Sequence, residues 1–122
     1  MTADRRARER RGRAAERAAA LWLRLKGYRI LDRRVRTPAG EIDLVARRRD
    51  VVAFIEVKAR STSAAAAESV THRQRARIVR AAAHFIASHP HLADTTQRFD
   101  MILIAPRSRP RHVISAWTES GD

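Results

Sequence analysis

The chain has 122 residues, a length that suits one folded domain, and it contains no cysteine, which excludes disulfide bonds and cysteine-based metal or redox sites. Its 26 basic and 13 acidic residues give a net charge of +13, which favours a polyanionic partner, nucleic acid first and an anionic membrane surface second. The longest apolar runs, Ala18–Leu23 and Val51–Ile55, are far shorter than the ~20 residues that span a bilayer. No secretory signal is recognisable, so we expect a cytoplasmic protein with no membrane partner.

A basic arm opens the chain. It contains six arginines: Arg5, Arg6, Arg8, Arg10, Arg11 and Arg13. We expect the arm either to be disordered or to extend the first helix, and its arginines either to bind phosphate groups or to be solvated. The chain then divides into this arm (residues 1–13), one domain (residues 14–118) and a C-terminal tail (residues 119–122). Arg11 and Arg13 are the arm's candidates for contact with nucleic acid.

The first helix of the domain is predicted over residues 14–26, where apolar residues recur at helical spacing. Its expected buried face consists of Ala18, Leu21 and Leu25, with Trp22 beside them. Gly27 stands where a helix C-cap belongs, because glycine readily takes the left-handed conformation that ends many helices.

Three strands are predicted next, over Tyr28–Arg36, Glu41–Arg47 and Val51–Ala59. The third is the most β-prone stretch of the chain. Thr37–Gly40 is typical of a turn, and the short separation of the second and third strands favours a hairpin. The small residues of Ser61–Ala67 predict a loop.

A second helix is predicted from a capping box with Thr71 as N-cap and Gln74 as the third helical residue. It should continue to about Ser88, because Pro90 stops it. Its expected buried residues are Ile78, Ala82, Phe85 and Ile86. Two further strands follow, Phe99–Ala105 and His112–Trp117. The order α-β-β-β-α-β-β predicts an α/β protein with a mixed β-sheet flanked by two helices.

The predicted hairpin brings charged side chains together. Its second strand should place an apolar set, Ile42, Leu44 and Ala46, on the core side. This requirement fixes the parity of the register, because a slip by one residue turns every side chain to the other face. A symmetric hairpin then places Asp43 opposite Glu56, and Glu41 opposite Lys58.

Two carboxylates opposed at about 4.5–5.5 Å repel each other unless a cation lies between them. Mg²⁺ or Mn²⁺ suits such oxygen ligands, and Lys58 on the same side of its strand could stabilise charge on a phosphate. This pattern indicates metal-dependent phosphodiester hydrolysis. The alternative is an ordinary ion pair between Glu41 and Lys58, with Asp43 and Glu56 each solvated.

The two motifs of the hairpin, Gly-Glu-Ile-Asp-Leu-Val-Ala from Gly40 and Phe-Ile-Glu-Val-Lys-Ala-Arg from Phe54, resemble those of the YraN-like family of bacterial proteins. The resemblance also covers Gly12-x-x-x-Glu16 in the first helix and Arg-Phe-Asp from Arg98. It extends over about residues 12–117, nearly the whole chain.

That family is similar to the restriction-endonuclease-like superfamily, whose site motif is written PD-(D/E)XK, and in pattern to archaeal Holliday-junction resolvases. The resemblance implies that Asp43 and Glu56 ligate Mg²⁺ or Mn²⁺ and that Lys58 assists the attacking water. Glu16 would approach the same site from the first helix. Glu41 belongs to the motif as a further candidate catalytic residue. The family's fold agrees with the order of elements predicted above.

Four further arginines are candidates for contact with nucleic acid: Arg60 at the end of its motif, and Arg73, Arg77 and Arg80 on one face of the second helix. The alternative for the helix is a solvated surface. The resemblance implies an endonuclease that acts on DNA rather than RNA, with branched or structured DNA as substrate, and a homodimer by analogy with resolvases. A module of nuclease fold that binds nucleic acid without cutting is the second hypothesis, and a basic protein-interaction subunit is the third.

Overall fold

The computed structural model describes residues 2–122, with the side chains of all of these except Arg8, Arg11 and Ser63. Its helices are α1 (Ala3–Leu25), α2 (Ser63–Glu68), α3 (His72–Ala87) and the short 3₁₀ helix η1 (Pro90–Leu92). Its strands are β1 (Arg29–Thr37), β2 (Gly40–Arg48), β3 (Val51–Ala59), β4 (Thr96–Ile104) and β5 (Arg111–Trp117).

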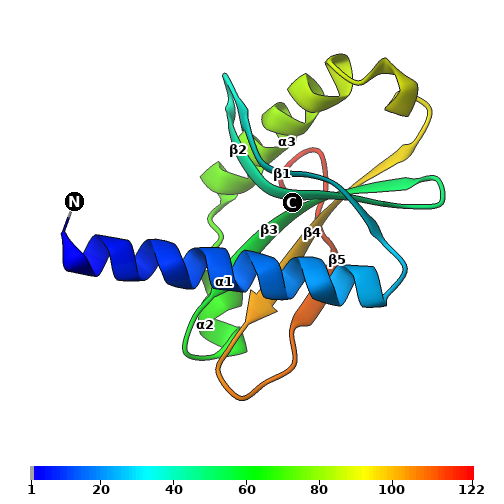
Figure 1. Ribbon diagram of the computed structural model, residues 1–122. Helices are drawn as coiled ribbons and strands as arrows, with labels where there is room; N and C mark the ends of the chain where they lie inside the picture. Colours follow the sequence, from blue (N-terminus) through cyan, green and yellow to red (C-terminus); the bar gives the residue numbers. More distant parts are fainter. Residues whose placement is uncertain (1) are drawn as a thin grey trace.

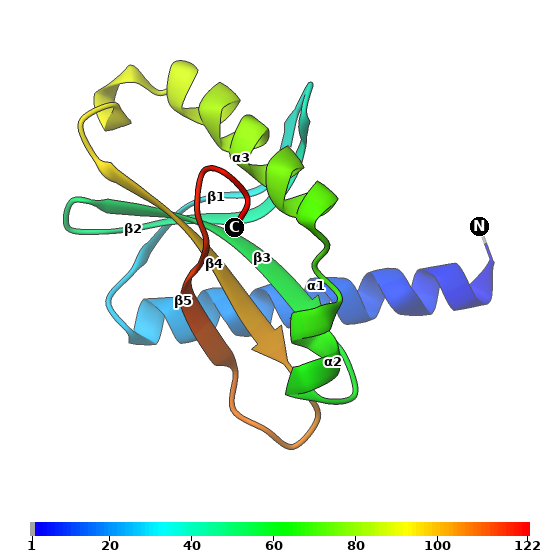
Figure 2. The same cartoon turned by 180° about the vertical axis from the view of Figure 1, so that it is seen from behind.

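The strands form one sheet in the order β1-β2-β3-β4-β5, so every strand pairs with its neighbours in the chain. Only β3 and β4 run parallel, and the other pairs are antiparallel. Helix α1 crosses one face of the sheet, and α3 lies against the opposite face (Figures 1 and 2). The predicted α/β class, with a mixed sheet between two long helices, is confirmed.

Helix α1 is one continuous helix through the basic arm. Thr2 caps its first turn, since the side-chain oxygen accepts the backbone N–H of Arg5, and Gly27 follows its end with φ 92°. Of the two open expectations for the arm, the helical one describes the structure. The side chain of Arg11 lies outside the described part of the chain. Within residues 2–122, no helix is long and apolar enough to cross a membrane.

The buried face of α1 differs from the predicted one. The buried residues are Ala15, Ala19, Ala20 and Leu23. Leu21 and Leu25, which were expected in the core, are 57% and 73% exposed. The alanine face of α1 is the buried one, because its short side chains let the helix lie close to the sheet. The helical spacing of the leucines alone does not show which side of the helix faces the sheet.

Two further boundaries follow from local chemistry and from pairing. The predicted loop over Ser61–Ala67 is wrong in part, because its alanines form α2 with Thr62 as N-cap. The capping box of α3, formed by Thr71 and Gln74, is confirmed. Strand β4 begins at Thr96, earlier than predicted, because it pairs in parallel with β3 from that residue onward.

The sheet is buried on both faces, so the core has two layers. The α3 layer includes Ile42, Val45, Phe54 and Phe85. The α1 layer includes Ala19, Leu44, Ala46 and Ile55. Ile42 and Leu44 thus face opposite sides although they are two positions apart, so the prediction that they share a face is wrong. Regular alternation in β2 breaks at Asp43, and sequence periodicity carries no sign of this break.

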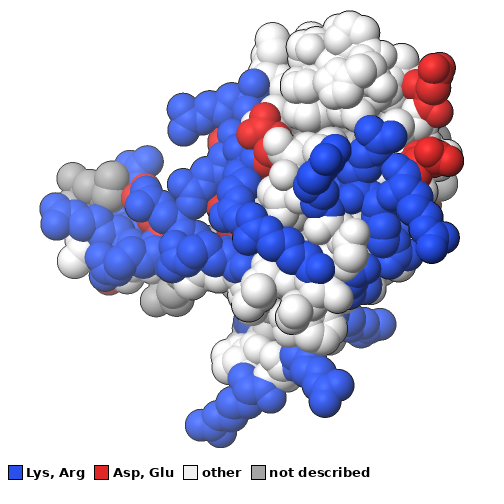
Figure 3. All heavy atoms as spheres, turned by 45° about the vertical axis from the view of Figure 1, so that its right-hand side comes forward, with Lys and Arg blue, Asp and Glu red and all other residues white. Residues whose placement is uncertain are grey.

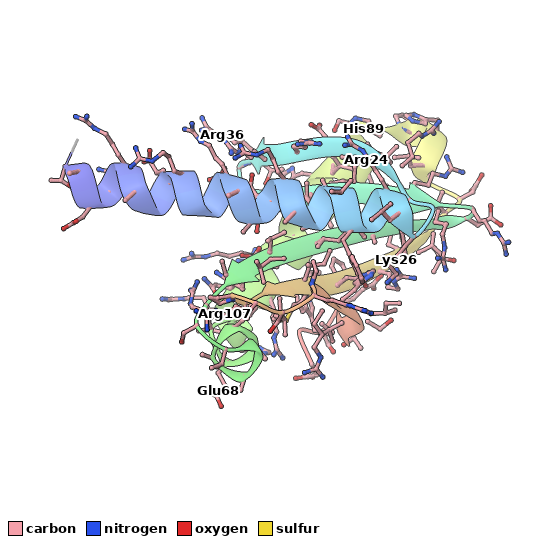
Figure 4. The ribbon with its side chains drawn as sticks, turned by 60° about the horizontal axis from the view of Figure 1, so that its bottom comes forward. Arg24, Lys26, Arg36, Glu68, His89 and Arg107 are labelled. Carbon is pink, nitrogen blue, oxygen red and sulfur yellow. The ribbon has the colours of Figure 1, made fainter. Side chains whose placement is uncertain are left out.

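A buried polar cluster joins the end of α1 to β4 and β5. Asp100 is fully buried, and its carboxylate accepts hydrogen bonds from Arg98 at 2.9 Å and from Nε2 of His112 at 2.7 Å. Lys26 Nζ lies 2.6 Å from Nδ1 of His112, and Figure 4 labels Lys26 between the end of α1 and the sheet. Arg98 also donates to the Tyr28 hydroxyl at 2.6 Å. These bonds connect the residues that follow α1 to β4 and β5.

Candidate functional site

A cavity of about 890 Å³ lies where α1 passes the C-terminal end of β3. Its walls are the middle of α1, the end of β3 with the residues that follow it, and the residues Ile104, Ala105 and Pro106 at the end of β4. Five residues singled out from the sequence line it: Glu16, Asp43, Glu56, Lys58 and Arg60. The fold therefore brings together residues from α1, β2 and β3 that are far apart in the chain.

Asp43 sits where β2 and β3 separate. The ladder between these strands has the predicted register from Arg48↔Val51 to Leu44↔Ile55, and it ends there. Beyond it, Oδ2 of Asp43 accepts the backbone N–H of Val57 at 2.8 Å. The ladder includes no pair between Asp43 and Glu56, because the Asp43 side chain takes the Val57 N–H, but the two side chains lie close enough to interact, as the predicted register requires.

Glu56 and Lys58 form an ion pair inside the cavity. The distance from Lys58 Nζ to Glu56 Oε1 is 3.3 Å, and the two side chains are only 15% and 14% exposed. Burial, together with the charge of Asp43, raises the pKa of Glu56 to about 7, although Lys58 acts in the opposite direction. Burial and the charge of Asp43 thus outweigh the effect of Lys58 on the pKa of Glu56.

Asp43 shows the same effect. Burial raises its pKa above the ordinary value, and the nearby charge of Glu16 adds to the rise, while the hydrogen bond from Val57 opposes it. Two half-buried, mutually repelling carboxyl groups fit a site that takes up a proton or a cation. Their oxygens are ligands of the kind that Mg²⁺ prefers, typically one or two carboxylates together with substrate phosphate.

The same carboxylates do not form a complete protein cage. Among the side chains that the structure describes, no group of three or more His, Cys, Asp or Glu residues is arranged to hold a metal ion. Asp43 and Glu56 are thus the pair that could hold a divalent cation. The remaining ligands would come from water and substrate, as is usual for Mg²⁺.

Glu16 is held by Arg34, a residue that the sequence reasoning missed. Nε of Arg34 donates to Oε2 of Glu16 at 2.9 Å, and this carboxylate raises the pKa of the guanidinium. Arg34 has φ 48°, in the left-handed region that arginine seldom adopts. It lies between the pairs Arg33↔Leu44 and Val35↔Ile42, opposite Asp43. In a chain this rich in arginine, residue type gave no signal for Arg34.

Glu41 lies away from Lys58. Its Oε1 is 3.7 Å from Nε of Arg36, and its side chain is 60% exposed, so the expected pairing of Glu41 with Lys58 is wrong. The break in β2 at Asp43 turns the tip of the β1–β2 hairpin toward α3. Glu41 there lines a second cavity, of about 570 Å³, together with Arg77. Glu56 lines both cavities.

The predicted nucleic-acid contacts occupy several surfaces. Arg60 lines the first cavity and Arg77 the second. Arg73 and Arg80 are exposed on α3 and line neither cavity. Arg13 is exposed on α1. Figure 3 shows lysine and arginine side chains gathered along α1 and over the neighbouring body of the molecule. Contact of these arginines with nucleic acid remains a prediction.

The fold and this cavity together define an α/β protein in which a mixed five-stranded sheet carries a half-buried pair of carboxyl groups beside a lysine. Residues 15–104 match the family described as "Uncharacterised protein family UPF0102", and the chain belongs to that family. The resemblance to YraN-like proteins is thereby confirmed at the level of the family.

Similar proteins from several bacteria, each named "UPF0102 protein", cover most of the chain. The protein from Rhodopseudomonas palustris (strain BisA53) is 58% identical over 111 residues, which are 91% of this chain and 85% of the relative. The protein from Parvibaculum lavamentivorans (strain DS-1) is 56% identical over 106 residues, 87% of this chain and 80% of the relative. The protein from Caulobacter sp. (strain K31) is 53% identical over 111 residues, 91% of this chain and 80% of the relative.

Proposed function

We propose that this protein is a divalent-metal-dependent endonuclease of restriction-endonuclease-like fold, which hydrolyses phosphodiester bonds of branched or otherwise structured DNA. The observation that carries the proposal is the convergence of Asp43, Glu56 and Lys58 in one cavity, with two mutually repelling carboxyl groups of raised pKa. Perturbed carboxyl groups of this kind concentrate at functional sites. A net charge of +13 supports a polyanionic substrate.

Asp43 and Glu56 would hold the cation, Mg²⁺ or Mn²⁺. When bound, such an ion supplies a Lewis acid for the phosphate and lowers the pKa of water. Lys58 places its ammonium group beside these carboxylates at 15% exposure, where a positive charge stabilises a phosphate more strongly than it does in water. Arg60, at the same cavity, adds a second positive group to orient the phosphate backbone.

Glu16 enters the cavity from α1 and is oriented by Arg34. Its carboxylate adds negative charge close to Asp43, and this charge makes the binding of a cation more favourable. Glu41 lies at the second cavity and pairs with Arg36, whereas Lys58 lies at the first cavity, so Glu41 is given no step in the proposed reaction. By analogy with resolvases, a homodimer would present two such cavities to one branched substrate.

The second candidate is a module of the same fold that binds DNA without cutting it. The basic surface favours this alternative, because phosphate contacts by arginine give affinity without any catalytic group. Substitution of the carboxylates separates the two candidates. A non-catalytic binder should bind as tightly or more tightly when a carboxylate close to the phosphate is neutralised, whereas an enzyme loses turnover.

The test uses end-labelled DNA as linear duplex, single strand, flap and four-way junction, each incubated with Mg²⁺, Mn²⁺ or EDTA. The wild type is compared with Glu56→Gln, Lys58→Ala and the exposed control Asp94→Asn. We expect metal-dependent products from the wild type and the control, and a loss of at least about 100-fold in the two site variants. Binding without cleavage of any substrate under either metal would contradict the nuclease and leave the binding module, with RNA as the next ligand.

A further inference from the structure

Helix α1 consists of a docked half and a projecting segment, which we define as residues 3–14. Its buried residues begin at Ala15, whereas every described side chain of residues 3–14 is exposed or only partly buried. A Cβ atom added at Gly12 would meet nothing within 4 Å. Figures 1 and 4 show this end of the helix extending beyond the edge of the sheet.

The projecting segment keeps its helical form through its own contacts. Thr2 caps it through the N–H of Arg5, and Arg5 and Glu9 form an ion pair one turn apart at 3.8 Å. The segment also continues without interruption into the docked half, which removes the cost of starting a new helix. It is therefore an extended arm of defined shape, none of whose described side chains is fully buried, and its last residues, Gly12 and Ala14, line the first cavity.

The composition of the projecting segment selects one kind of partner. It holds six arginines against two acidic residues, Asp4 and Glu9, and its apolar residues are alanines alone. The larger apolar side chains of α1 all lie in the docked half: Leu21, Trp22, Leu23 and Leu25. An interfacial membrane helix needs bulky apolar side chains opposite its basic face, and this segment has none. Its charge fits a phosphate backbone.

The segment also has a direction relative to the cavity. It leads directly to Glu16, which lines the cavity with Asp43 and Glu56, so a nucleic acid that lies along the segment reaches the site at one end. Twelve helical residues span about 18 Å, and duplex DNA rises about 3.4 Å per base pair, so the segment matches about five base pairs. Figure 3 shows the basic side chains that accompany it.

We propose that the projecting segment of α1 binds the phosphate backbone of duplex DNA on one side of the site and extends the bound length by about five base pairs. This inference rests on the proposed function for the nature of the ligand. It does not rest on cleavage. The contacts it adds are independent of sequence and lie on one side only, because α1 projects from one edge of the sheet.

The test measures binding of fluorescein-labelled duplexes of 6 to 24 base pairs by the full-length protein in EDTA, at several salt concentrations. Two variants that each lose two positive charges are compared. Arg10→Gln/Arg13→Gln alters the projecting segment, and Arg29→Gln/Arg33→Gln alters exposed residues of β1. Glutamine keeps helix propensity close to that of arginine, so α1 should remain folded, which circular dichroism checks.

We expect the affinity of the wild type to rise with duplex length and to level off. For Arg10→Gln/Arg13→Gln, the arm variant, the affinity should level off about five base pairs sooner than for the wild type. This variant should also bind long duplexes about tenfold more weakly, and the slope of its log affinity against log salt concentration should be smaller by about two. The β1 variant should keep the wild-type length dependence. Equal behaviour of the two variants would overturn the proposal, as would a length shift near ten base pairs or binding to anionic vesicles that the arm variant alone loses. Length-dependent binding without cleavage in Mg²⁺ would contradict the nuclease and leave this inference standing.

Discussion

The carboxylate of Asp43 accepts the backbone N–H of Val57 at 2.8 Å, at the point where the ladder between β2 and β3 ends. One side chain thus satisfies a backbone donor that the separating strands would leave unpaired, and it does so inside the cavity. The bond fixes Asp43 in place although the pKa of its carboxyl group is raised by burial. Asp43 therefore both holds the end of the β2–β3 ladder and carries a carboxyl group of raised pKa, and different substitutions can separate these two properties.

Asp43→Asn and Asp43→Ala should therefore differ. Asparagine retains an oxygen that can accept the Val57 N–H, whereas alanine leaves that donor unsatisfied at a cost of about 1–3 kcal/mol. Both remove a charge that raises the pKa of Glu56, so this pKa should fall below about 7 in each variant. Urea unfolding measures the first effect and a carboxyl-carbon NMR titration the second. Equal stability of the two variants would show that the bond to Val57 contributes nothing.

Glu56 should make the protein less stable as the pH rises. Its pKa is about 7 in the folded protein and near 4.5 in the unfolded chain, so its stabilising effect is complete below pH 4.5 and is lost as the pH rises to 7. We expect a loss of about 2–4 kcal/mol across this window, and Asp43 acts in the same direction. Urea unfolding at pH 5 and pH 8 tests this, and Glu56→Gln should remove most of the difference. If Glu56→Gln kept the full difference in unfolding free energy between pH 5 and pH 8, that difference would come from other groups.

Arg34 should tolerate glycine better than a branched residue. Its φ of 48° costs a non-glycine residue about 1–2 kcal/mol, and glycine removes this cost. The lost ion pair with Glu16 contributes little to stability, because the Arg34 side chain is 44% exposed and water screens the two charges. Arg34→Gly should thus lie within about 1 kcal/mol of the wild type, and Arg34→Val should lose about 1–3 kcal/mol.

The neighbouring residue Arg33 provides the control for this comparison. It is exposed in the same strand, and it is not among the residues with positive φ. In ordinary strand geometry valine is preferred over glycine, so Arg33→Val should be more stable than Arg33→Gly. The order of the two substitutions is expected to reverse between positions 33 and 34. The same order at both positions in urea unfolding would refute the strain at Arg34.

Asp100→Asn should be among the most destabilising substitutions in the protein. Burial alone would raise the pKa of Asp100, but the hydrogen bonds from His112 and Arg98 hold it below the ordinary value. Its contribution is therefore present above pH 3.8 and is lost as the pH falls further. Asparagine leaves Arg98 without its buried partner, at a cost of about 3–5 kcal/mol.

Acid unfolding, together with urea unfolding at pH 7, measures this cost. Asp94, an exposed aspartate, provides the control, and Asp94→Asn should change the free energy of unfolding by less than about 0.5 kcal/mol. The loss of stability as the pH falls below 4 should be smaller in Asp100→Asn than in the wild type, because the carboxyl group that takes up a proton is gone. If both variants unfolded alike, the cluster around Asp100 would not hold α1 against β4 and β5.

Strong local signals in the sequence predicted much of the fold. The β-branched run Val51–Ala59 gave the bounds of β3, and the capping box at Thr71 gave the start of α3, because in both cases neighbouring residues alone decide the structure. The buried side of α1 could not be predicted in this way. It depends on how closely the helix approaches the sheet, which is a property of the packed protein.

The candidate site shows the same division. The motifs predicted that Asp43, Glu56 and Lys58 lie together, and Glu16 was placed with them through the family resemblance. The positions of Glu41 and Arg34 depend on the break in β2 and on a left-handed residue in β1. A sheet register extrapolated with regular alternation carries no information on either feature.

Every carboxylate and lysine proposed for catalysis is encoded in the first half of the chain, whereas β4 and β5 follow in the second half. Ile104, Ala105 and Pro106, at the end of β4, close one wall of their cavity. During synthesis the hairpin that carries these groups is therefore complete well before its environment exists. A nascent chain that ends before β4 holds Asp43 and Glu56 without this wall of their cavity, and burial is the main cause that raises the pKa of both carboxyl groups in the complete fold.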